Sequence, residues 1–150
     1  MSLQTTRSTV FTFIAVAILC CGLLGCSGEA SGDRTSSLTG LASLRGLSRE
    51  AMPYAEATRN HQPTLVEFYA DWCTTCQGMA PMLADLHQKQ SELNFVALDI
   101  DEPRWADLVA RYEVSGVPKI VLLDREATPI QTFVGAVPQI VLERAIAALD

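Results

Sequence analysis

Basic side chains are scarce in this 150-residue sequence, which has 11 Lys and Arg against 17 Asp and Glu and a formal net charge of −6 at pH 7. Surfaces that bind nucleic acid neutralise phosphates with clustered Lys and Arg. The basic residues that lie close together here are Arg45 and Arg49, and on a helix they would form an ordinary solvated face. The composition therefore argues against a nucleic-acid-binding protein.

Histidine and cysteine, the usual zinc ligands, are also few. The chain has two histidines, His61 and His87, and beyond residue 26 it has only the cysteines of one Cys-x-x-Cys pair. A structural zinc site takes four ligands, and on a helix His87 would lie roughly 16 Å beyond Cys76. We therefore expect no metal site.

The one long apolar run, VFTFIAVAILCCGLLGC from Val10 to Cys26, carries no charge and follows a segment in which Arg7 is the only charged side chain. This layout is typical of a secretory signal. As a helix the run would be about 25 Å long, slightly shorter than a bilayer core of about 30 Å. For residues 1–26 a cleaved signal peptide, an uncleaved membrane anchor and a lipoprotein signal all stay open.

The end of this run, LLGC, resembles a bacterial lipobox, in which the cysteine receives lipid, so Cys26 is a lipidation candidate. Alternatively, Cys20, Cys21 and Cys26 are small apolar residues of a membrane helix. The positive N-terminal end favours a cytoplasmic N-terminus with the remainder translocated. We expect a membrane-anchored protein whose domain faces the periplasm or an equivalent lumen.

Residues 27–47 are rich in Ser, Gly and Thr, which predicts a flexible tether. Beyond them the pattern predicts strands at residues 64–70, 94–101, 119–124 and 130–135, and helices at residues 48–60, 73–90, 102–114 and 138–150, with Ser48 as N-cap of the first helix. The order αβαβαββα predicts an α/β fold, a mixed central sheet with helices on both faces.

The pair Cys73 and Cys76 lies where a predicted strand gives way to a helix. The first turn of a helix has unpaired amide groups and a partial positive charge, which lower the pKa of a thiol at Cys73 and favour its reactive thiolate. Cys76, one turn further, can resolve the mixed disulfide that results. Because so short a loop adds little stability, the pattern indicates thiol-disulfide exchange rather than a structural bridge.

The segment VEFYADWCTTCQGMAPML resembles the active-site segment of the thioredoxin family. GVPK, Gly116 to Lys119, precedes a strand at the place where this family has a cis-proline facing the active-site disulfide. Gly135 matches the glycine that follows the last strand. The resemblance covers residues 48–150 and implies a thioredoxin fold for this thioredoxin-like domain.

The resemblance implies roles for individual residues. Cys73 is then the nucleophile and Cys76 the resolving thiol. Trp72 covers the disulfide, while Val117 and Pro118 hold substrate backbone beside the sulfur atoms. The Cys73–Cys76 disulfide is the only redox group implied, and no cofactor is expected.

Glu67 matches the buried acid that assists proton transfer at the resolving cysteine, and burial should raise its pKa. In the alternative strand register it would point outward as an edge charge. Ala97 occupies the position where many thioredoxins carry a lysine that pairs with this acid. Thr74 and Thr75 between the cysteines lack the histidine of strongly oxidising members, which favours a reductase.

VEFYADWC, the N-terminal apolar segment and LDREATPIQTFVG together resemble the membrane-anchored thioredoxin-like proteins of cyanobacteria and chloroplast thylakoids. This resemblance implies a monomeric reductant that takes electrons from a membrane thiol carrier of the CcdA type. The implied substrates are protein disulfides, including those of apocytochrome c haem-site cysteines during cytochrome c biogenesis. A disulfide-introducing oxidase and a non-catalytic thioredoxin-fold assembly module stay open as alternatives.

Overall fold

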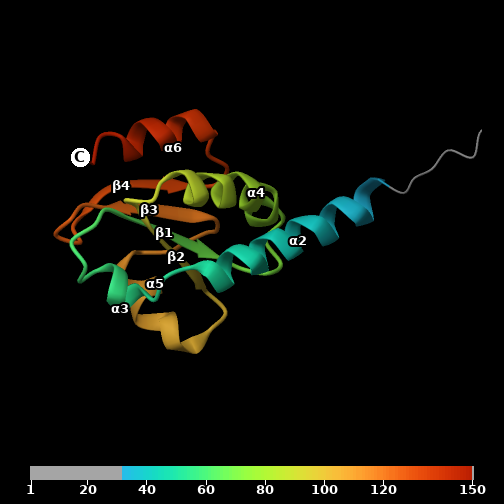
Figure 1. Cartoon of the computed structure of the whole chain (residues 1–150). Helices are drawn as coiled ribbons and strands as arrows, with labels where there is room; N and C mark the ends of the chain where they lie inside the picture. Colours follow the sequence, from blue (N-terminus) through green and yellow to red (C-terminus); the bar gives the residue numbers. More distant parts are fainter. Residues whose placement is uncertain (1–31, 150) are drawn as a thin grey trace, which may run out of the picture. The chain divides into compact units, whose positions relative to one another are not determined.

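The computed structural model of the chain describes residues 32–149 (Figure 1). The signal or anchor predicted over residues 1–26, including the lipidation candidate Cys26, lies outside this range. Within the described range, no helix has the length and apolar character needed to cross a bilayer.

A four-stranded sheet in the order β2-β1-β3-β4 forms the centre of the fold. Its strands are β1 (Thr64–Tyr69), β2 (Asn94–Asp99), β3 (Lys119–Leu123) and β4 (Pro129–Val134). Strand β1 runs parallel to β2 and antiparallel to β3, and β3 runs antiparallel to β4. The prediction of a mixed sheet is confirmed, and every residue of the two central strands is buried because both faces are covered.

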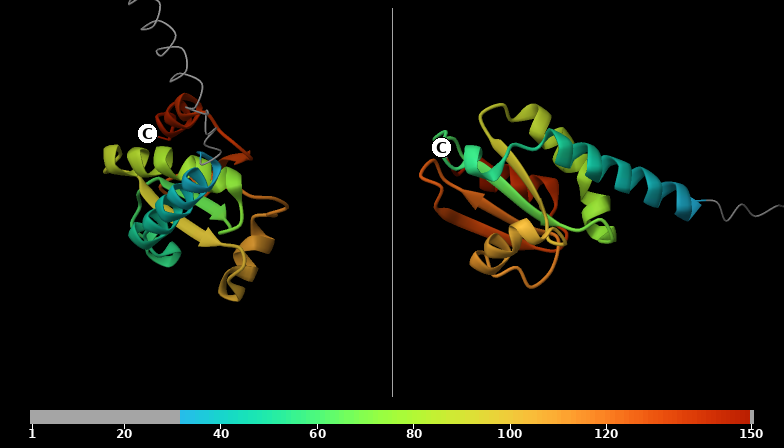
Figure 2. Two further views of the ribbon diagram at one scale, coloured as in Figure 1. Left: turned by 90° about the vertical axis from the view of Figure 1, so that its right-hand side faces the viewer. Right: turned by 90° about the horizontal axis from the view of Figure 1, so that it is seen from below.

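Helices pack on both faces of this sheet, as predicted (Figure 1 and Figure 2). They are α2 (Gly32–Glu50), α3 (Tyr54–Ala57), α4 (Thr74–Lys89), α5 (Ala106–Arg111), which follows a 3₁₀ turn at Pro103–Trp105, and α6 (Gln139–Ile146). Helices α4 and α6 bury leucines such as Leu83 and Leu142 against one face of the sheet. Helices α3 and α5 cover the other face, where Phe68 lies in the core.

Helix α2 corrects the prediction of a flexible tether over residues 27–47, because from Gly32 onward the chain is helical. Leu38, Leu41, Leu44 and Leu47 recur every three residues, and the last two are 0% and 2% exposed. Burying a leucine side chain stabilises a fold by about 1.5–3 kcal/mol. This gain outweighs the weak helix propensity of the interspersed Ser and Gly.

The helix predicted from Ser48 to Asn60 is also wrong, because the chain forms two helices there. Helix α2 ends at Glu50, and α3 begins directly after Pro53. Proline has no N–H and disfavours helical backbone at the residue before it. The N–H of that residue, Met52, instead donates to the carbonyl oxygen of Phe95 on edge strand β2, at 2.8 Å.

We expect Leu44→Ala to lower the free energy of unfolding by about 2–4 kcal/mol, because it leaves a cavity in the core. Leu38→Ala, on the same helix but 70% exposed, should change it by less than about 0.5 kcal/mol. Urea unfolding of the full chain in detergent, followed by circular dichroism, measures both values. Equally small effects would mean that α2 does not belong to the core.

Candidate redox site

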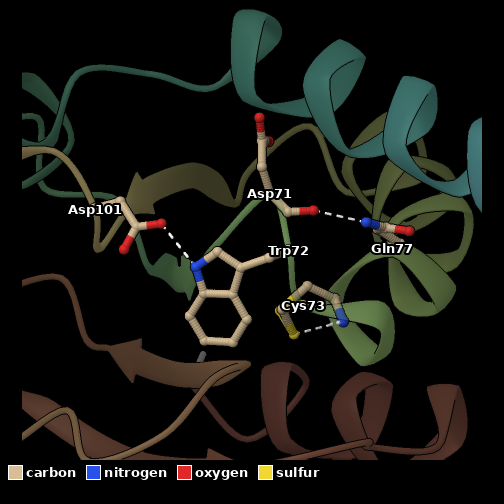
Figure 3. Close-up of a disulfide and its surroundings, with 6 residues drawn as sticks. Asp71, Trp72, Cys73, Gln77 and Asp101 are labelled. Atoms are coloured by element: carbon tan, nitrogen blue, oxygen red, sulfur yellow. Dashed lines mark hydrogen bonds between the residues drawn. A yellow bond between two sulfur atoms is a disulfide. The ribbon is translucent and has the colours of Figure 1, made fainter.

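Cys73 occupies the N-cap position of α4 and forms a disulfide with Cys76 in the first turn. The two Cα atoms are 5.3 Å apart. The backbone N–H of Cys76 donates to Sγ of Cys73 at 3.0 Å (Figure 3). In the reduced protein this amide and the positive end of the helix would stabilise a thiolate at Cys73, which lowers its pKa.

The two sulfur-bearing residues differ in their access to solvent. Cys76 is fully buried, whereas Cys73 is 6% exposed. Both lie in a cluster of buried side chains that includes Tyr69 and Ala80. Of the two sulfur atoms, that of Cys73 is therefore the more accessible to a partner thiol or disulfide.

Trp72 presents its ring to solvent beside the disulfide and is 65% exposed. Its Nε1–H donates to Oδ2 of Asp101 at 2.7 Å, which holds the indole in place (Figure 3). Asp101 was not identified from the sequence. The strand order could have suggested this contact. Trp72 and Asp101 follow the parallel neighbouring strands β1 and β2, whose carboxyl ends share one edge of the sheet.

A second contact that the sequence did not predict joins the residue before Trp72 to α4. The side-chain amide of Gln77 donates through Nε2 to the backbone oxygen of Asp71 at 2.6 Å (Figure 3). Because Gln77 directly follows Cys76 in α4, this bond fastens the loop residue Asp71, which precedes Trp72 and Cys73, to the helix that bears the disulfide.

The peptide bond between Val117 and Pro118 is cis, as the resemblance implied. Val117 packs against the cluster that contains both cysteines, so the structure brings this loop to the disulfide. The N–H of Gly135 donates to the Pro118 oxygen at 2.8 Å. Gly135 has φ of +83°, a conformation that favours glycine.

Glu67 is fully buried, so the alternative in which it points outward is wrong. It lies between Leu65 and Tyr69 in β1, and because side chains alternate along a strand, it shares their face of the sheet, beneath α4. Neither carboxyl oxygen has a hydrogen-bond partner among the described residues. Burial in these apolar surroundings raises the pKa of Glu67 to about 8.

The described residues around Glu67 place no cation opposite it on the sheet. Its neighbours in register are Ala97 on β2 and Ile120 on β3. Lys119 lies on the other face and donates through Nζ to the backbone oxygens of Tyr112 and Glu113. Ala97 occupies the position where many thioredoxins carry a lysine, and β3 does not place another lysine next to Glu67 in its stead.

The two histidines lie away from the disulfide. His87 is in the last turn of α4, where its ring packs against Phe95 with centroids 5.5 Å apart. His61 lies in the loop before β1. In residues 32–149 no group of three or more His, Cys, Asp or Glu side chains is placed to hold a metal ion.

Several known proteins are similar to this chain in sequence. A TxlA homolog of Synechocystis, named a thiol:disulfide interchange protein, is 40% identical over 144 residues, which is 95% of this chain and 75% of that protein. The chloroplastic thioredoxin-like protein HCF164 of Arabidopsis thaliana is 39% identical over 108 residues, 71% of this chain. This chain covers only 41% of the length of HCF164.

The oxidised form of mitochondrial thioredoxin 3 from Saccharomyces cerevisiae superposes with a TM-score of 0.59 at 28% identity, covering 71% of this chain and 99% of that one. The thioredoxin family profile matches residues 47–148, a range that contains both cysteines, Trp72 and the cis-proline. The predicted family and enzyme class are confirmed. The chain belongs to the thioredoxin family, whose members are thiol-disulfide oxidoreductases.

Proposed function

We propose that this chain is a membrane-tethered, extracytoplasmic protein-disulfide reductase. The observation that carries the proposal is the Cys73–Cys76 disulfide at the N-terminus of α4, with Cys76 fully buried and Cys73 6% exposed. Relatives named thiol:disulfide interchange proteins support an exchange enzyme. The reducing direction rests on Thr74 and Thr75, which supply no histidine to stabilise a strongly oxidising pair.

The reaction transfers two electrons from the dithiol to a substrate disulfide. The Cys73 thiolate attacks one substrate sulfur, and the other substrate sulfur leaves as a thiolate that takes up a proton. The Cys76 thiol then loses its proton and attacks Sγ of Cys73, which releases the second substrate thiolate. The oxidised Cys73–Cys76 pair is the product of this step and must be reduced by an electron donor.

Glu67 is the proposed proton acceptor for Cys76. It lies on the sheet face covered by α4, the helix that bears Cys76. A pKa of about 8 is close to physiological pH, so the carboxyl group can both release and accept a proton there. Because no lysine faces it on the neighbouring strands, burial alone sets this pKa.

The proposed electron donor is a membrane thiol carrier of the CcdA type, and the proposed substrates include apocytochrome c haem-site cysteines. Support comes from the family resemblance and from the cyanobacterial and chloroplastic relatives. The proposed location is the periplasmic or thylakoid-lumenal side of the membrane. The Asp101 carboxylate beside Trp72 and the formal net charge of −6 suit a partner that carries positive charge near its cysteines.

Equilibration of the full chain with glutathione buffers tests the direction of electron flow. We expect a reduction potential close to that of thioredoxin, about −270 mV. Alkylation of free thiols followed by mass spectrometry of the peptide with both cysteines gives the reduced fraction. A potential near about −120 mV, typical of strong oxidants, would support the oxidase alternative instead.

Replacing the resolving thiol identifies the partners. In Cys76→Ser, attack by Cys73 should stop at the mixed disulfide, so partners stay bound until a reductant is added. Non-reducing electrophoresis and mass spectrometry of membranes containing the variant identify them, with Cys73→Ser/Cys76→Ser as the control that should bind none. Apocytochromes and a membrane thiol carrier are the expected partners. Their absence from the trapped set would contradict the proposed pathway, and unchanged function of both serine variants would favour a non-catalytic module.

The raised pKa of Glu67 predicts how stability depends on pH. In the unfolded chain this carboxyl group titrates near its ordinary value of 4.5, and in the folded protein near 8. Unfolding therefore releases a proton between these values, so the contribution of neutral Glu67 is fully present below about pH 4.5 and is lost as the pH rises toward 8. Compared with Glu67→Gln, the wild type should lose about 1 kcal/mol per pH unit between about pH 5 and 7.5.

Urea unfolding of the oxidised protein at several pH values measures this difference. Glu92→Gln, which changes an exposed carboxylate, serves as the matched control and should follow the wild-type profile. Parallel profiles for the wild type and Glu67→Gln would show that Glu67 is already ionised at neutral pH.

A further inference from the structure

Helix α2 contributes a side chain to the buried cluster that surrounds the disulfide. Leu44 is fully buried and belongs to the same cluster of side chains as Cys73 and Cys76. Leu47, one turn further, enters the main core between the sheet and α4. Helix α2, most of which precedes the matched family segment, therefore packs in the same cluster as the redox pair.

Helix α2 also lies close to α4 (Figure 2), and the closest approach is at Gln77, which directly follows Cys76. A Cβ atom added at Gly40 would lie 3.0 Å from Cβ and 3.1 Å from the backbone oxygen of Gln77. This spacing leaves almost no room for a side chain at residue 40. Gln77 is the residue whose amide holds the backbone oxygen of Asp71.

A third contact reaches the other end of the same segment. Nε and Nη2 of Arg45 donate to Oδ2 of Asp71 at 3.1 and 2.7 Å. Figure 3 shows the Asp71 carboxylate directed toward α2 while its backbone oxygen faces Gln77. Helix α2 and Gln77 thus hold Asp71 from two sides, and Trp72 and Cys73 follow it immediately in the chain.

The charges around Cys73 make the Arg45 contact electrostatically important. Titratable groups on the elements that pack near it are Glu67 and Tyr69 on β1, Asp99, Asp101 and Glu102 at and after the end of β2, and Lys119 on β3. Lys119 is bound to backbone oxygens on the far face of the sheet. Arg104 pairs with Glu102, and Glu67 is mostly protonated at neutral pH because burial raises its pKa to about 8. The carboxylates of Asp71, Asp99 and Asp101 remain at this edge, and Arg45 neutralises Asp71, the one that lies nearest to Cys73 in the chain.

We propose that α2 is a positioning element of the redox site, in which Gly40 permits close contact with α4 and Arg45 holds and neutralises Asp71. This inference rests on the proposed function in taking Cys73 as the attacking thiol. Without the guanidinium, the Asp71 carboxylate acts on the Cys73 thiolate uncompensated. Its repulsion raises the pKa of Cys73 and lowers the thiolate fraction at neutral pH.

The test measures the alkylation rate of Cys73 with iodoacetamide against pH, in the reduced full chain in detergent, by mass spectrometry of the peptide that contains it. Arg45→Met should raise the midpoint of this rate–pH curve, which reports the pKa of Cys73, by about 0.5 pH unit. Arg45→Lys, which keeps the charge, should restore most of the difference. Arg49→Met, an equal loss of charge at an exposed site on the same helix, should match the wild type.

Because the Arg45–Asp71 pair is solvent-exposed, the difference should shrink at high ionic strength. Identical midpoints for Arg45→Met and Arg49→Met would overturn the electrostatic role. A shift in Arg45→Met that Arg45→Lys does not reduce would overturn it as well, because charge would not be the cause.

A glycine pair tests the contact between the helices. Gly40→Leu should force α2 away from Gln77 and shift the Cys73 midpoint in the same direction as Arg45→Met. Gly46→Leu is the matched control, because a Cβ atom at Gly46 meets nothing within 4 Å. Equal Cys73 midpoints for Gly40→Leu and Gly46→Leu would show that close contact between α2 and α4 does not affect Cys73. This conclusion would hold whatever the Arg45 and Arg49 variants show.

Reduction of insulin disulfides by the same wild-type preparation separates the two proposals. If the wild type reduces insulin and the α2 variants keep wild-type midpoints, only the positioning role fails. If the wild type does not reduce insulin while the midpoints shift as expected, the reductase proposal fails and the effect of α2 on Cys73 stands.

Discussion

The unpaired amides in the first turn of α4 are the constraint on which the redox site depends. They can act on a thiolate only if Cys73 lies at the N-cap, and the N–H of Cys76 then points at its sulfur. The remaining contacts hold that turn in place. Gln77 ties it to the preceding loop, and the Val117–Pro118 loop packs against the cysteine cluster.

Glu67, a buried carboxylic acid with no hydrogen-bond partner within residues 32–149, is the second determinant of the site. An ionised carboxylate in apolar surroundings is costly, so Glu67 responds by holding its proton to about pH 8. Thioredoxins that carry a neighbouring lysine can divide this cost between two charges, whereas Ala97 offers none. In this chain the protonation of the acid is governed by desolvation, which makes it sensitive to how tightly α4 covers the sheet.

Helix α2 shows where reasoning from composition failed. Ser, Gly and Thr over residues 27–47 are typical of a linker, yet the leucines at every third position define one apolar side of a helix. Two of these leucines are buried, one in the cysteine cluster and one in the main core. The periodicity was the better signal, because burial of an apolar stripe outweighs local propensity once a surface exists to receive it.

The sequence by itself determined the strands, the mixed sheet and the position of the cysteine pair, because these follow from apolar periodicity and from a local strand-to-helix junction. It also identified Pro118 and Gly135 through short motifs. Only the tertiary structure decided that Glu67 is buried with no hydrogen-bond partner in the described part of the chain, that Asp101 holds Trp72, and that Arg45 reaches Asp71. These contacts join residues 26 or more positions apart or depend on which face a strand buries, so they exist only after the elements have packed.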